Sequence, residues 1–410
     1  MNHSSFRNFS VACTPPRREL HPMLRAACTM LLAIAALLAV GTVQAATYIV
    51  TTEGDVATGS ASNCSGTNCP TLRDAVAAAN ATAANDTIRF WAIVTEVTLT
   101  HGHIAINPSS SGGTLTIIGS VILSGGNASR VLNPWSGSNV TLRDLTIAKG
   151  YATFHGGGIW NDGSLVLDDV TVRDNKASGG LGGGIFNNGT LTIRTSTISG
   201  NKTIGTSDDG GGIYNNGSLT VWRSTLSSNV SARHGGGIFN ASGKALTAEH
   251  STFSGNAAAQ YGGGIANFGG NLGLLFATLS GNSSADGGGA LDSSGSTTLY
   301  NSVIANSISG SDCWRSSGSI SAGGTLIENG IDCVSNVAGN LYDGDPDLGP
   351  LADNGGPTKT HLPQPGSVLI NKAHDAPVSI DQRGEPRPMG GAMDIGAVEV
   401  VLPLFANGFE

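Results

Sequence analysis

Charged and aromatic side chains are scarce in this chain: 12% of its 410 residues are charged and 5% are aromatic, whereas glycine contributes 60 residues. Low charge combined with abundant Gly, Ser, Thr and Asn can indicate disorder. Here, however, apolar residues recur at regular positions through the middle of the sequence. That regularity indicates an ordered, repetitive fold.

A retained membrane span is also lacking. The apolar run at residues 30–40 is too short to cross a bilayer, follows basic residues that end at Arg25, and precedes a small-x-small site that ends at Ala45. This pattern predicts a secretory signal over residues 1–45, cleaved after Ala45. Because that length is long for such a signal, we expect initiation at Met23.

Basic side chains are few once the signal is removed. Residues 1–45 contain four Arg and one Glu, so the rest of the chain keeps 17 of 21 basic and 28 of 29 acidic side chains, a formal charge of −11. This balance disfavours nucleic acid and anionic membrane surfaces as partners.

Cysteine is absent from the centre of the chain. Beyond the signal, the four cysteines form two local pairs, Cys64 with Cys69 and Cys313 with Cys333. Outside the cytoplasm the simplest interpretation is two disulfides. Zinc is not expected, because the spacing is not Cys-x-x-Cys and no His lies close by.

Familiar catalytic motifs are missing as well. The chain contains no Gly-x-Ser-x-Gly nucleophile elbow, no His-Glu-x-x-His and no phosphate-binding glycine loop. The paired-Asp and Gly-His-Gly strings of polygalacturonase-like enzymes are not found either. No complete catalytic constellation is therefore apparent.

What the chain does have is a repeat. A Gly triplet followed by an apolar residue or Ala recurs every 25 to 28 residues, beginning at Gly156, Gly182, Gly210, Gly235, Gly262 and Gly287. A fixed period in this range predicts a solenoid whose units bury their apolar faces by stacking on one another.

Each repeat contains three short runs with period-2 alternation, separated by Gly and Asn turn signals, as at residues 185–187, 191–193 and 196–198. Such runs favour strands over helices. Three apolar columns per coil predict an all-β parallel β-helix with three short strands per coil. Weaker repeats upstream extend it to about eight coils over residues 111–310.

An Asn closes each repeat at an equivalent position. These residues are Asn175, Asn201, Asn229, Asn256, Asn282 and Asn306. We expect them to form an amide ladder from coil to coil at one corner.

The two open ends of a stacked β structure need covers. Upstream, the Ala-rich segment 72–80 follows Pro70 and Thr71 and predicts a short helix. We expect residues 46–110 to cap the N-terminal end and residues 311–400, where the period is lost, to form an irregular C-terminal cap. The two cysteine pairs would tie these caps.

Several strings resemble known bacterial exported proteins. The alternation of Gly-Gly-Gly-Ile at 262–265 with Phe-Ser-Gly-Asn at 253–256 is similar to the repeat of polymorphic outer-membrane proteins. The string Cys-Pro-Thr-Leu-Arg-Asp-Ala at 69–75 resembles the Cys-Ser-Leu-Arg-Glu-Ala (CSLREA) signature, and residues 85–90 fit the same family.

The other end resembles the choice-of-anchor module, through residues 345–358, 381–388 and 394–399. Together these resemblances imply a right-handed, pectin-lyase-like β-helix that is secreted or held on the outer surface of a bacterium. The general preference for right-handed crossovers agrees with that handedness. Residues 401–410 are similar to a short sorting tail, although a frayed terminus is the alternative.

One column of side chains is a candidate for catalysis. Asp209 and His234 directly precede two successive Gly triplets, so adjacent coils would bring them close together. A carboxylate and an imidazole could serve as acid and base on a polysaccharide. The alternative is a polar loop column that faces solvent.

A second column is a candidate for ligand binding. If the Ile of each Gly-Gly-Gly-Ile points inward, the next residue points outward, which stacks Trp160, Phe186, Tyr214 and Phe239. Exposed aromatic stripes bind sugar faces or partner proteins. The alternative is that a loop covers them.

Two further features have simpler explanations. A column of Thr171, Thr197, Thr225, Thr252, Thr278 and Ser302 reflects β-propensity. The triplet Asp343, Asp345 and Asp347 is a calcium candidate, but alternating Asp in a Gly/Pro turn also makes Asx-turns. No cofactor is expected beyond that calcium.

We therefore expect an exported, non-catalytic β-helix protein, adhesin-like or glycan-binding, with an extracellular polysaccharide or a host or cell-surface protein as its partner. Two alternatives stay open. One is a polysaccharide lyase or hydrolase of pectin-lyase-like architecture that uses Asp209 and His234. The other is a purely structural cell-surface component.

Overall fold

The structure, a computed structural model, describes residues 44–107 and 113–400. The expected signal over residues 1–45, apart from its last two residues, and the expected tail over residues 401–410 lie outside the described residues.

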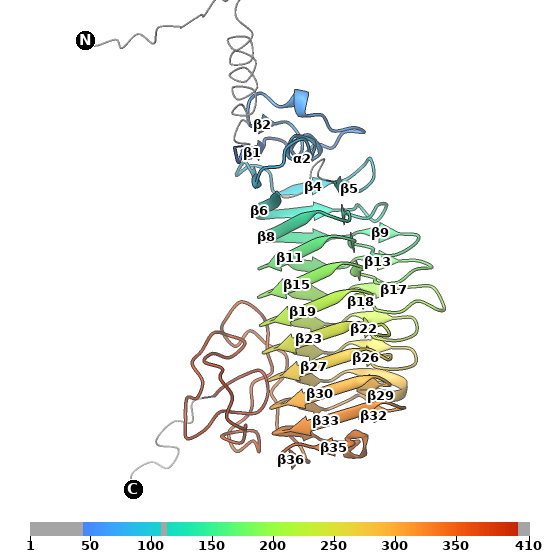
Figure 1. Cartoon of the computed structure of the whole chain (residues 1–410), viewed down its shortest axis with the longest axis vertical. Coiled ribbons are helices and arrows are strands. Elements are labelled where there is room, and N and C mark those ends of the chain that lie inside the picture. The colour runs from blue at the N-terminus through green and yellow to red at the C-terminus, as the bar shows by residue number, and fades with distance from the viewer. Residues whose placement is uncertain (1–43, 108–112, 401–410) are drawn as a thin grey trace, which may run out of the picture. The chain divides into compact units, whose positions relative to one another are not determined.

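The described chain forms a parallel β-solenoid of about nine turns with little helix, which confirms the all-β class and adds about one turn to the expected count. Consecutive turns stack with parallel strands, as Figure 1 shows from β6 to β36. Equivalent residues face each other in register: Leu165 lies opposite Leu191, and Leu191 opposite Leu219.

The strands fall into two sheets. The first sheet holds β1 (Thr47–Val50), β2 (Asn68–Cys69), β3 (Asp86–Phe90), β4 (Glu96–Thr98), β6 (Thr114–Ser124), β8 (Asn139–Ala148), β11 (Ser164–Asp168), β12 (Thr171–Arg173), β15 (Thr190–Arg194), β16 (Thr197–Ser199), β19 (Ser218–Trp222), β20 (Thr225–Ser227), β23 (Ala245–Glu249), β24 (Thr252–Ser254), β27 (Asn271–Leu275), β28 (Thr278–Ser280), β30 (Ser296–Tyr300), β31 (Val303–Ala305), β33 (Ser319–Gly323), β34 (Thr325–Ile327), β35 (Asn336–Val337) and β36 (Leu341–Tyr342). The second sheet holds β5 (Ile104–Ile106), β7 (Leu132–Pro134), β9 (Tyr151–Ala152), β10 (Ile159–Asn161), β13 (Lys176–Ala177), β14 (Ile185–Asn187), β17 (Lys202–Thr203), β18 (Ile213–Asn215), β21 (Val230–Ser231), β22 (Ile238–Asn240), β25 (Ala257–Ala258), β26 (Ile265–Asn267), β29 (Ser283–Ser293) and β32 (Ser309–Arg315). The helical elements are α2 (Leu72–Asn80) and the 3-10 turns η1 (Ala61–Asn63) and η2 (Ile331–Cys333).

A central coil contains four strands instead of the expected three. In one coil these are β14, β15, β16 and β17, and the last of them has only two residues. A two-residue strand is too short to leave an alternating pattern in the sequence. Between the second and third strands, Thr195 adopts φ 44°, and the equivalent Arg223 of the next coil adopts φ 48°. This left-handed residue bends the chain while both strands stay in one sheet.

The apolar columns form the core. The Ile column is fully buried at Ile159, Ile185, Ile213, Ile238 and Ile265. The Leu column is equally buried at Leu165, Leu191, Leu219, Leu246 and Leu272. Because each residue packs on its equivalents one coil away, the core is continuous along the solenoid.

Two ladders of buried amides run beside this core. In the corner ladder, the Nδ2 atoms of Asn175, Asn201, Asn229 and Asn256 each donate to Oδ1 of the next Asn at 2.9–3.0 Å, ending at Asn282. A second ladder, the strand ladder, which the sequence analysis missed, links Asn161, Asn187, Asn215, Asn240 and Asn267 at 2.8–2.9 Å. All ten side chains are buried.

Asn306 does not belong to the corner ladder. Strand pairing sets Leu279 opposite Ile304, one residue later than the spacing suggested. Asn306 therefore matches Gly281, and both adopt positive φ, 58° and 69°. The Asn306 side chain is exposed and donates to the Ser280 hydroxyl at 3.3 Å.

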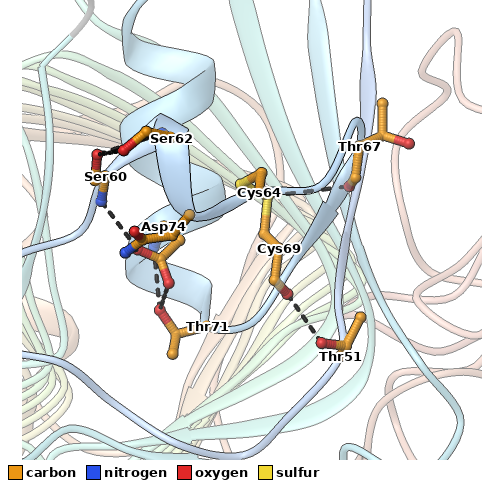
Figure 2. Close-up of a disulfide and its surroundings, with 9 residues drawn as sticks. Thr51, Ser60, Ser62, Cys64, Thr67, Cys69, Thr71 and Asp74 are labelled. Atoms are coloured by element: carbon orange, nitrogen blue, oxygen red, sulfur yellow. Dashed lines mark hydrogen bonds between the residues drawn. A yellow bond between two sulfur atoms is a disulfide. The ribbon is translucent and has the colours of Figure 1, made fainter.

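The N-terminal end is covered by α2. Thr71 caps this helix by accepting the backbone N–H of Asp74, and Leu72 packs into the main core. Figure 2 shows the disulfide between Cys64 and Cys69 beside the helix. The Asp74 carboxylate accepts hydrogen bonds from the Ser60 backbone N–H at 2.9 Å and the Thr71 hydroxyl at 2.7 Å, so it ties this loop to the helix.

The C-terminal region differs from the expected cap over residues 311–400. The coils continue through β32 to β36, and a disulfide between Cys313 and Cys333 links β32 to η2. Residues 343–400, the flank module, then lie against the side of the solenoid, as the red trace in Figure 1 shows. They cover the downstream part of the Thr column: Gln382 Nε2 donates to Thr225 at 2.9 Å, and the Ala397 N–H donates to Thr278 at 2.9 Å.

We predict that Asn229→Ala lowers the free energy of unfolding by roughly 2–4 kcal/mol, because it removes ladder bonds on both sides of a buried amide and leaves partners unsatisfied. Urea denaturation followed by circular dichroism measures this change. The matched control is Asn306→Gly, which places glycine where Gly281 already stands one coil earlier. Equal stability losses for the two variants would contradict a structural role for the ladder.

Candidate functional site

The structure brings Asp209 and His234 together through the backbone. The Asp209 carboxylate accepts the His234 backbone N–H at 3.1 Å and the Arg233 Nε–H at 2.8 Å, and it forms an ion pair with Arg233. Asp209 is only 2% exposed. Its negative charge is therefore compensated by Arg233 and is not directed at the imidazole of His234.

The His234 ring packs among aromatic side chains instead. Its centroid lies 4.9 Å from Phe268, 5.1 Å from Tyr261 and 6.4 Å from Phe239. Burial lowers the pKa of His234, and its Nδ1 atom has no hydrogen-bond partner among the described residues. A neutral ring held in an aromatic cluster has a packing role.

The aromatic column stacks from coil to coil. The rings of Phe186 and Tyr214 are 5.6 Å apart, and those of Tyr214 and Phe239 are 4.9 Å apart, both nearly parallel. Phe186 and Phe239 are only 7% exposed, however, so the column is not the open stripe that alternation suggested. Loop residues cover it: the His155 ring lies 4.5 Å from Phe186, and His234 lies beside Phe239.

The column stays accessible at its upstream end. There Trp160 is half-buried and lines a hollow of about 310 Å³ together with Arg130, Asn133, Trp135, Ser136 and Asp162. Trp135 is 45% exposed. The sequence analysis missed Trp135 because it lies in a coil that precedes the first Gly triplet, where the repeat is weak.

Another hollow lies on the first sheet, upstream of the flank module. Its lining includes Asp144, Asp169, Thr146 and Thr171. Burial and the neighbouring Asp144 raise the pKa of the Asp169 carboxyl. This is a pair of carboxylates on adjacent coils that the sequence analysis did not identify.

The calcium candidates lie on the surface at the start of the flank module. Asp343, Asp345 and Asp347 are all exposed, and Asp345 Oδ1 accepts the Asp347 backbone N–H at 2.8 Å, which is an Asx-turn. Over residues 44–107 and 113–400, no group of three or more His, Cys, Asp or Glu side chains is placed to hold a metal ion.

The flank module docks through a buried cluster. The His250 ring stacks 5.3 Å from Phe276, and the Arg387 guanidinium lies 4.4 Å from the centroid of the same Phe276 ring. Arg387 also forms an ion pair with Glu399 at 3.3 Å. Burial, reinforced by Arg387, lowers the pKa of His250 to about 3, so this histidine is neutral at physiological pH.

Comparison of the chain with protein-family models, with curated proteins and with solved structures returned no significant match. The resemblances of the N-terminal, repeat and C-terminal strings therefore remain expectations. Among the described residues, no helix is both long enough and apolar enough to cross a membrane.

The depressed pKa of His250 predicts a pH dependence of stability. Below about pH 6.5 the unfolded chain binds a proton at this histidine, whereas the folded chain does so only near pH 3. As the pH falls from about 6.5 toward 3, His250 should therefore lower the free energy of unfolding by up to about 1.4 kcal/mol per pH unit. Urea denaturation at pH 7, 6, 5 and 4 measures the slope.

His250→Phe should flatten that slope, because phenylalanine can stack on Phe276 without titrating. The control is Asn306→Gly, which removes no titratable group and should leave the slope as it is in the unaltered protein. A slope that His250→Phe does not change would contradict the assignment.

Proposed function

We propose that this chain is an exported, non-catalytic β-helix protein that binds extracellular carbohydrate, in the manner of an adhesin or a glycan-binding stalk. The two disulfides and the expected secretory signal support an extracellular location. The solenoid supports a scaffold role, because in-register coils hold surface side chains in fixed positions.

The observation that carries the proposal is the state of the catalytic candidates. Asp209 is paired with Arg233, and the His234 ring is held in an aromatic cluster, so neither is placed to transfer a proton to a substrate. By contrast, Trp135 and Trp160 line an open hollow. Accessible tryptophan, together with the engagement of Asp209 and His234 in pairing and packing, supports binding of sugar without cleavage.

We expect the protein, produced from the full chain, to bind polysaccharides without shortening them. We would incubate it with neutral and acidic polysaccharides, with and without calcium, and follow polymer size and co-elution by size-exclusion chromatography. Intact polymer that co-elutes with the protein is the expected result.

Other outcomes would reject the proposal in different ways. Shortened polymer would support the enzyme alternative and direct mutagenesis to Asp144 and Asp169 in place of Asp209 and His234. Intact polymer that elutes separately would favour a protein partner or a purely structural role. Self-association of the chain in the same experiment would favour the structural role.

A further inference from the structure

We propose that the hollow formed by Arg130, Asn133, Trp135, Ser136, Trp160 and Asp162 is a subsite for one neutral pyranose residue of a glycan. This inference rests on the proposed carbohydrate-binding function and specifies where the sugar binds and of which class it is.

The hollow offers the two kinds of surface that a sugar ring needs. Trp135 and Trp160 give apolar faces on which the C–H groups of a pyranose can stack. The cavity of about 310 Å³ is open to solvent, and Trp135 is 45% exposed, so a ligand can enter. In contrast, Phe186 and Phe239 farther along the column are covered.

Polar atoms around these rings remain free to bind hydroxyls. Asp162 Oδ1 accepts the Trp160 Nε1–H at 2.9 Å and the Asn188 amide at 3.0 Å, while Oδ2 accepts no hydrogen bond from the described residues. Asn133 Nδ2 donates to the Trp160 carbonyl at 2.9 Å, and its Oδ1 atom accepts no hydrogen bond from residues 44–107 and 113–400. Two acceptors beside an aromatic face can take the protons of neighbouring sugar hydroxyls.

Arg130 is fixed in place and completes the wall. Its Nε and Nη2 atoms donate to the carbonyls of Gly156 and His155 at 2.9 and 2.8 Å, and its guanidinium lies 4.9 Å from the Trp160 ring centroid. Nη1 makes no hydrogen bond within the part of the chain that the structure describes, so it can donate to a sugar hydroxyl oxygen. Because these contacts hold the side chain before a ligand arrives, little conformational entropy is lost on binding.

The charge of the hollow indicates a neutral ligand. Arg130 and Asp162 supply one positive and one negative charge, and burial lowers the pKa of Arg130 whereas Asp162 opposes that shift. The chain beyond residue 45 carries a formal charge of −11, which repels uronate polymers. An uncharged glycan does not experience this repulsion.

Neighbouring coils provide room for a longer glycan. Asn216 Nδ2 donates to Asn188 Oδ1 at 2.8 Å, and Asn188 donates to Asp162, so a row of amides leads away from the hollow along the solenoid. Asn188 is exposed. A glycan chain that leaves the subsite in this direction would meet one amide per coil.

The test is binding of neutral hexasaccharides (cellohexaose, maltohexaose and β-1,4-galactohexaose) and of hexagalacturonate to the protein from the full chain, by isothermal titration calorimetry. We expect at least one neutral hexasaccharide to bind more tightly than hexagalacturonate.

Trp135→Ala should weaken the binding of that neutral hexasaccharide about tenfold or more, because it removes one stacking face. Asp162→Asn should weaken it too, since the amide places a donor where the sugar needs an acceptor.

The matched control is Trp314→Ala. Trp314 is likewise an exposed tryptophan, at 50%, but it lies in β32 of the second sheet, far along the column. The Trp314→Ala variant should bind the hexasaccharides as the unaltered protein does. An unchanged thermal midpoint for Trp135→Ala, Asp162→Asn and Trp314→Ala would establish that each variant is folded.

Three results would overturn this inference. Neutral binding that Trp135→Ala leaves unchanged would place the sugar elsewhere while the proposed function stands. Preference for hexagalacturonate would reject the neutral class. Failure of every oligosaccharide to bind, together with failure of polysaccharide to co-elute, would reject the proposed function itself.

Discussion

A buried amide needs a donor and an acceptor. In this solenoid an Asn inside either ladder donates to the equivalent Asn of the next coil and accepts from the equivalent Asn of the preceding coil. The corner ladder through Asn229 and the strand ladder through Asn215 therefore hold successive coils in one register. A slip of one residue would break both ladders and turn the apolar columns toward solvent. The remaining features of the molecule depend on that register.

Register also explains how the flank module finds its place. It positions the Thr hydroxyls of successive coils at a regular spacing, and Gln382 bridges two of them, accepting from Thr252 at 2.6 Å while it donates to Thr225. Side chains that would otherwise face solvent, such as Phe276, are buried beneath Arg387. The module thus covers part of one sheet face, and the acidic hollow at Asp144 lies on coils upstream of it.

The same stacking separates packing residues from candidate binding residues. Within the aromatic column, the residues His155 and His234, which precede Gly triplets, lie against Phe186 and Phe239, so these two rings are buried and contribute to stability, whereas Tyr214 between them is half-buried. At the upstream end Trp160 keeps one side open and Trp135 of the preceding coil extends it. Aromatic residues at the same position of the repeat therefore differ in accessibility according to the coil in which they lie.

The sequence by itself determined the repeat, the parallel solenoid, the apolar columns and both cysteine pairs, because each is a local pattern that recurs or lies within a short stretch of chain. It was less reliable where a pattern shifts by one residue, as at Asn306, or where a strand has only two residues. Tertiary structure alone decided that residues 343–400 lie on the flank, since contacts such as Gln382 to Thr225 join positions 157 residues apart. It also decided that Asp209 pairs with Arg233, because a spacing shows which residues are neighbours but not which atoms face each other.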